Sequence, residues 1–162
     1  MDIVHLLREY AAYDQWANGR LLERLEREDP ALLDAPVKSS FPTLRDTLLH
    51  VRDAEHVWLC RLQGLQHNWP AEADRSLATL LKHGALLQTY VMGLDQAELE
   101  RERTYHDLKG NAHHQAAWRM LMHCFNHSSY HRGQVVTIMR GLGLEGIPAM
   151  DLVVYQRTLA RS

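Results

Sequence analysis

The stretch IVHLLREYAAYDQWANGRLLERL, residues 3–25, places apolar side chains at spacings of mostly three and four residues. These positions are Ile3, Leu6, Leu7, Tyr10, Ala17, Leu21 and Leu25. The spacing matches the 3.6-residue turn of an α-helix, so the stretch predicts an amphipathic helix with one apolar face. We expect this helix to end before Pro30, because the residue before a proline is pushed out of helical geometry.

A second helical segment follows a connection that is rich in proline and serine. Thr43 is its predicted N-cap, with Asp46 three residues later in the manner of a capping box. Its apolar stripe continues to about Leu62. The segment therefore predicts a second helix that buries one face.

Two more helices and a tail complete the chain. The third helix is expected near residues 76–94, and the fourth and longest at about 112–140, with Gly141 as its natural stop. Residues 98–110 lack a helical stripe and predict an irregular segment with short extended pieces. The tail, 147–162, opens with a proline and predicts a short fifth helix.

Together these segments predict an all-α four-helix bundle in a single domain that spans residues 1–162. The connections, of about 10–18 residues, are longer than simple up-and-down neighbours need. The periodicity therefore predicts the bundle, and it leaves the direction of each helix open.

Composition excludes several classes of protein. The chain has 162 residues, 18 Lys and Arg against 20 Asp and Glu, and a formal charge of −2, which argues against nucleic-acid binding. No apolar run reaches the length of a membrane span, and the first residues do not predict a signal peptide. Two cysteines, Cys60 and Cys124, form no disulfide framework, so we expect a cytoplasmic protein.

The chain contains 11 histidines, and His123, His127 and His131 form a row at i, i+4 and i+8. Two imidazoles four residues apart on a helix can chelate one metal ion. A row of three has a chance expectation of about 0.05 at this composition, so it carries information. The competing interpretation is a half-exposed helix face whose histidines are satisfied by ordinary hydrogen bonds.

The row alone cannot form a closed site, because successive rings drift around the helix. A ligand from another helix is needed, and His50 and His56 on the second segment are the candidates. The remaining histidines are expected to be exposed or in loops: His5, His67, His83, His106, His113 and His114.

Several other side chains have structural interpretations. Trp16 and Trp58 are expected to anchor the core or its edge. Asn18 lies within a helix, where it is expected to make a structural hydrogen bond. Cys124 is expected to be a core thiol. Arg132 is either a solvated charge or an anion clamp.

The segment NHSSYHRGQ, residues 126–134, followed by RGLG at 140–143, resembles the signature of the DinB family of metal-binding four-helix bundles. Three further stretches agree in the same order: 13–22, 49–51 with Glu55 and Trp58, and Ile147-Pro148 with Asp151 and Tyr155. Residues 66–112 match only in length and helix placement.

The resemblance implies a divalent-metal site whose ligands are His50, His127 and His131. It leaves His123 one turn away, as an outer group or a substrate-side group. It also implies an up-down-down-up bundle and a homodimer. Zinc is the first expectation for the ion, and nickel, manganese and iron also accept imidazole.

Three neutral imidazoles leave a coordination position for water or substrate, as in catalytic sites. Some relatives use a low-molecular-weight thiol, which implies a metal-dependent transferase or isomerase that acts on a small electrophile. Hydrolysis would need a base, for which Asp53, Glu55, His123 and Tyr130 are candidates by proximity. The alternative is a non-catalytic, damage-inducible bundle whose metal site is structural or sensory.

Overall fold

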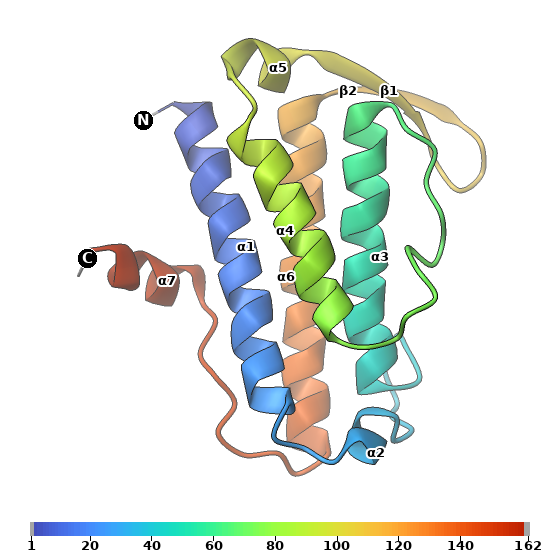
Figure 1. The fold of residues 1–162 in the computed structure, drawn as a ribbon, viewed down its shortest axis with the longest axis vertical. Coiled ribbons are helices and arrows are strands. Elements are labelled where there is room, and N and C mark those ends of the chain that lie inside the picture. The colour runs from blue at the N-terminus through green and yellow to red at the C-terminus, as the bar shows by residue number, and fades with distance from the viewer. Residues whose placement is uncertain (1, 161–162) are drawn as a thin grey trace.

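The computed structural model describes residues 2–160, so residues 1, 161 and 162 of the predicted domain lie outside the described part. Four long helices form a bundle, which confirms the predicted all-α fold (Figure 1). They are α1 (Ile3–Leu25), α3 (Leu44–Gln63), α4 (Ala78–Met92) and α6 (Ala117–Gly141). The smaller elements are α2 (Pro30–Leu33), α5 (Gln96–Glu100), α7 (Leu152–Leu159) and the strands β1 (Glu102–His106) and β2 (Ala112–Ala116).

The helix directions follow the up-down-down-up order. In Figure 1, α1 and α6 run one way along the bundle, and α3 and α4 run the other way. Because α3 and α4 are consecutive and parallel, the segment that joins them, residues 64–77, travels back along the outside of the bundle. This crossover explains why the connections are longer than antiparallel neighbours need.

The start of the fourth helix differs from the prediction. Residues 112–116 form β2, which pairs antiparallel with β1, and α6 begins only at Ala117. The turn between the strands decides this: the Asp107 carboxylate accepts backbone N–H bonds from Lys109 and Asn111, and Gly110 has φ +84°. This local turn chemistry favours a hairpin where the sequence pattern predicted helix.

Helix ends mostly follow their predicted signals. The Thr43 hydroxyl accepts a 3.0 Å bond from the backbone N–H of Asp46, as a capping box predicts. The predicted stop at Gly141 is two residues early, because the left-handed residue is Gly143, at φ +77°. The tail contains the short helix that was predicted there, at Leu152–Leu159.

The interior of the bundle has two apolar zones. One contains Leu7, Leu62 and Phe125, and the other contains Leu21 and Leu48. A layer of buried polar side chains lies between these zones along the helices: Asp14, Asn18, Glu55, Ser128 and Arg132. The two zones hold the helices together, and the polar layer fixes the level at which the candidate site lies.

Two sequence expectations about the core are confirmed. Cys124 is buried in the first apolar zone, and Trp58 packs against that zone while half-buried. Trp16 packs against Tyr13 and Tyr155 at the edge of the bundle. Among the described helices, none combines the length and apolar character that crossing a bilayer would require.

Candidate metal centre

The buried polar layer joins α6 to α1 and α3 through a continuous set of contacts. The Arg132 guanidinium pairs with Asp14 and donates a 3.0 Å bond to the Asn18 side-chain oxygen. Asn18 in turn donates to Glu55 Oε1 at 3.2 Å, and the Ser128 hydroxyl donates to the same oxygen at 3.2 Å. Asn18 therefore has the structural role that was predicted.

This layer corrects the prediction for Arg132, which is neither a solvated charge nor an anion clamp. Its side chain is 3% exposed and is neutralised by Asp14 across 118 positions of sequence. Burial and the neighbouring Asp14 charge raise the pKa of Glu55 well above its usual range, because both disfavour the charged carboxylate. Glu55 is fully buried and its Oε1 already accepts two hydrogen bonds, so it is poorly placed to act as a base on a solvent water.

Adjacent positions on the same α6 turns carry the histidine cluster. The Nε2 atom of His127 lies 3.0 Å from Nε2 of His50 and 3.1 Å from Nε2 of His131. Within residues 2–160, these three form the one set of potential ligands whose donor atoms all lie within 4.8 Å of one another. Two helices, α3 and α6, thus bring together the three residues that the resemblance implied.

Neighbouring side chains orient the cluster. Nδ1 of His131 lies 2.7 Å from Oε1 of Gln134, so an Nδ1–H donated to that oxygen leaves the Nε2 lone pair facing the other rings. The Gln134 amide also donates a 2.9 Å bond to the Ser40 hydroxyl, and the Phe41 ring lies 4.3 Å from the His50 ring. Residues 40–41 therefore hold the cluster from the loop before α3.

The electrostatics of the cluster favour neutral rings. Burial, with a smaller contribution from the neighbouring histidines, lowers the pKa of both His50 and His127 to about 4. Their Nδ1 atoms are buried and have no hydrogen-bond partner among the described residues. A neutral imidazole with a free lone pair is the form that binds a metal ion.

The donor set fits a divalent transition metal. Three imidazoles suit zinc, nickel and iron, and three protein ligands leave at least one position for water or substrate. No carboxylate or cysteine within the described residues joins the cluster as a fourth ligand. The arrangement is therefore chemically complete as an open site, while occupation by an ion stays a prediction.

The other histidines lie elsewhere. His56, the second candidate from α3, contacts Cys60 and lies 5.2 Å, ring to ring, from His83. His123 is exposed and packs on Trp58, with its ring 6.1 Å from that of His127. Neither ring belongs to the cluster.

The prediction that His83 is exposed is wrong. It is 7% exposed, and its Nε2 atom lies 2.9 Å from a carboxylate oxygen of Glu72. Its position three residues after Leu80 and four before Leu87 places it on the apolar face of α4, and this spacing could have revealed its burial.

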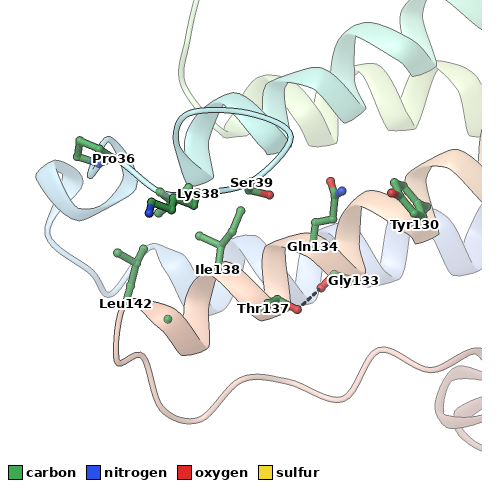
Figure 2. Close-up of a pocket in the computed structure, with 11 residues that line it drawn as sticks. Pro36, Lys38, Ser39, Tyr130, Gly133, Gln134, Thr137, Ile138 and Leu142 are labelled. Atoms are coloured by element: carbon green, nitrogen blue, oxygen red, sulfur yellow. Dashed lines mark hydrogen bonds between the residues drawn. The ribbon is translucent and has the colours of Figure 1, made fainter.

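Two hollows flank the cluster. The first, of about 420 Å³, is lined by His50 itself together with Phe41 and Trp69. The second, of about 620 Å³, lies between α6 and the loop before α3, with Tyr130 and Gln134 at one end (Figure 2). Sequence reasoning missed Phe41 and Trp69, which lie in connecting segments where no periodic pattern exists. The Tyr130 ring is 62% exposed and lies 5.1 Å from the His131 ring.

Comparisons with known proteins cover most of the chain. A profile of the DinB family matches residues 3–159. Protein DinB of Bacillus subtilis (strain 168) is 23% identical over 149 residues, which cover 84% of this chain and 86% of that protein.

Solved structures share the fold. YfiT from Bacillus subtilis, described as a probable metal-dependent hydrolase with an unusual four-helix bundle topology, matches with a TM-score of 0.62 and 15% identity over 86% of this chain and 89% of that one. A DinB-like protein from Bacillus cereus ATCC 10987 matches with a TM-score of 0.62 and 20% identity over 85% and 91% of the two chains.

Proposed function

This chain belongs to the DinB family, and on that premise we propose that it is a metal-dependent enzyme acting on a small electrophilic substrate. His50, His127 and His131 hold one divalent ion through their Nε2 atoms, zinc being the first choice before nickel, manganese and iron. The observation that carries the proposal is the convergence of these three atoms, at 3.0 and 3.1 Å, from two different helices.

An ion bound by three imidazoles polarises a substrate oxygen and lowers the pKa of a water or thiol beside it. The protein's own groups position the reaction. Gln134 fixes the ring of His131, and Phe41 covers one face of His50. The hollow lined by His50 and Trp69 provides a place next to the cluster for a small substrate.

The surroundings favour a thiol over water as the nucleophile. Glu55 is fully buried with its pKa raised well above the usual range, and Oδ1 of Asp53 accepts from the Arg52 guanidinium at 2.8 Å and from the backbone N–H of Ala71. Activation of water needs a base beside the ion, and no carboxylate among the described residues joins the histidine cluster, whereas a thiolate needs no strong protein base. We therefore propose a thiol-dependent transferase or isomerase, with a low-molecular-weight thiol as cosubstrate.

Hydrolysis is the second candidate function. YfiT is described as a probable metal-dependent hydrolase, and His123 is an exposed imidazole whose ring lies 6.1 Å from that of His127. Burial lowers the pKa of His123 below its usual range, so it is neutral and able to accept a proton at physiological pH. A homodimer in the cytoplasm, with no nucleic-acid partner, completes the proposal.

Elemental analysis of the untagged protein, combined with turnover assays, tests this function. About one divalent ion per chain should be present, and His50→Ala, His127→Ala and His131→Ala should each remove it. The matched controls are His56→Ala on α3 and His123→Ala on α6, which should retain the ion.

Turnover should be assayed on esters, epoxides and α,β-unsaturated carbonyl compounds, with and without added cysteine as the thiol. Turnover that requires both ion and thiol supports the transferase or isomerase; turnover without thiol that His123→Ala abolishes supports hydrolysis. A bound ion with no turnover across the panel would favour the non-catalytic alternative. Absence of metal after reconstitution would overturn the proposal.

A further inference from the structure

The larger hollow, on the α6 side of the cluster, has an apolar wall. Figure 2 shows Ile138 and Leu142 along α6 at one end of it, and Tyr130 and Gln134 at the other. Its volume, about 620 Å³, is within the range of small-molecule sites. Gly133 keeps the helix surface low there, since nothing lies within 4 Å of where its Cβ would be. The hollow therefore has the size and the wall of a small-ligand site.

Among the described residues, the only charge that lines this hollow is positive. Lys38 is the single charged residue among its eleven lining residues, and it lies across from Ile138 and Leu142 (Figure 2). Within residues 2–160, no carboxylate forms an ion pair with Lys38. The smaller hollow differs, because its lining contains both arginine and acidic side chains. An ammonium group at the end of an apolar trough favours a ligand that has an anionic group on an apolar body.

The hollow is joined to the histidine cluster by Gln134. The oxygen of its amide group accepts from His131, and the nitrogen of the same group donates to Ser40 in the loop that forms the opposite wall. A four-residue step on a helix rises about 6 Å, so Ile138 lies about one step beyond Gln134 along the trough. A ligand whose anionic end contacts Lys38 thus extends its other end toward His131.

We propose that this hollow binds a small organic anion with an apolar body, whose carboxylate or sulfonate contacts Lys38 and whose opposite end lies beside the cluster. That this anion is one of the two reactants, with the other in the hollow lined by His50 and Trp69, rests on the proposed function. Its binding does not, because the hollow's lining contains none of the three cluster histidines. The site therefore predicts binding in the metal-free protein as well.

Titration calorimetry of octanoate on the metal-free, full-length chain tests the proposal. Three comparison ligands are used. Acetate lacks the apolar body, octan-1-ol lacks the charge, and octylamine carries a positive charge. Octanoate should bind about fivefold more tightly than octan-1-ol. Lys38→Gln should remove that preference, and Lys109→Gln, on the exposed turn of the hairpin, should leave it unchanged.

A second pair of variants tests the location. Thr137 is an exposed helical residue that lines the hollow, so Thr137→Trp should fill it and weaken octanoate binding more than tenfold. Thr89→Trp, at an exposed position of α4 away from the hollow, is the matched control. Equal binding of octanoate and octylamine, or no effect of Thr137→Trp, overturns the proposal.

Sedimentation of the same variants tests whether a second copy of the chain occupies the hollow. A parent dimer that Thr137→Trp converts to a monomer would show that a second copy of the chain covers the hollow, which also contradicts the proposal. Metal content, measured in parallel, separates the two hypotheses. If the proposed function is wrong, the metal-free protein should still bind octanoate. If octanoate does not bind, the metal content and turnover measured on the parent protein still stand.

Discussion

Two polar clusters lie on the same turns of α6, one residue apart, and they differ in whether their members have complementary partners. Ser128 and Arg132 face the core, where each charge or hydroxyl has a partner. His127 and His131 face His50 on α3, where three like groups converge. A step of one residue turns a helix by about 100°, which is enough to place neighbouring residues in both environments.

The difference shows which buried polar groups indicate a site. The Asp14–Arg132 pair carries opposite charges, and Asn18 and Ser128 donate to Glu55 Oε1, so in this layer most polar groups face a complementary partner, although Glu55 Oε2 has none. In the histidine cluster, Nε2 atoms face each other at 3.0 Å, and two Nδ1 atoms are buried without partners. Such a cluster is stabilised when an ion supplies the missing positive charge.

Removing the central cation of the polar layer should have the largest effect. Arg132→Met leaves Asp14 buried without its partner, and breaking a buried pair in this way lowers the free energy of unfolding by about 3–5 kcal/mol. Urea denaturation of the metal-free protein measures it. Arg20→Met, at an exposed position of α1, should change stability by less than about 0.5 kcal/mol. A loss below about 1 kcal/mol for Arg132→Met would contradict the role of the polar layer in stabilising the fold.

Gln134→Leu should affect the histidine cluster and spare the fold. Losing the acceptor for His131 Nδ1 should weaken metal binding about 10–100-fold. The free energy of unfolding of the metal-free protein should change by less than about 1 kcal/mol, because the side chain is only partly buried. Competition titration with a chromophoric chelator measures the affinity, with Gln63→Leu on α3 as control. Unchanged affinity would mean that Gln134 does not orient a ligand.

Acid should destabilise the metal-free protein through the cluster. The pKa of His50 and of His127 is about 4 in the folded chain and near 6.5 when unfolded. Between these values the unfolded chain binds the extra protons, so stability falls as the pH drops from about 6.5 to 4. The double variant His50→Gln/His127→Gln should show a shallower fall in urea denaturation across this window. An identical slope would contradict the lowered pKa values.

The polar layer should respond to pH with the opposite sign, and more weakly. The pKa of Glu55 is raised in the folded chain, so its contribution is present below pH 4.5 and is lost as the pH rises through the folded value. Glu55→Gln keeps the shape and removes the titration, so its stability should decline less than that of the parent on the alkaline side. Thermal unfolding from pH 5 to 9 makes this comparison, and parallel curves would refute it.

The sequence predicted the bundle well, because each long helix carries its own 3.6-residue stripe. It could not place Arg132, since a lone arginine in a helix looks solvated until Asp14 is brought next to it by folding. The hairpin was missed because residues 112–116 have no strand pattern of their own, and their pairing depends on the turn at Asp107.

The candidate ligands came from a different kind of signal. The histidine spacing predicted a row of candidate ligands on α6, but it did not decide between His50 and His56 as the ligand from α3. The family resemblance favoured His50. The geometry brings His50 into the cluster and places His56 against Cys60. Phe41 and Trp69 could not be anticipated, because they reach His50 from loops whose paths the sequence does not determine.

The most direct test is an anomalous-scattering map from crystals of the zinc-loaded protein, recorded at the zinc absorption edge. The account predicts one peak per chain, about 2.0–2.1 Å from the Nε2 atoms of His50, His127 and His131, with a non-protein ligand completing the coordination. A peak at His56 and His83 instead, or a peak closed by a fourth protein side chain, would contradict the open three-histidine site.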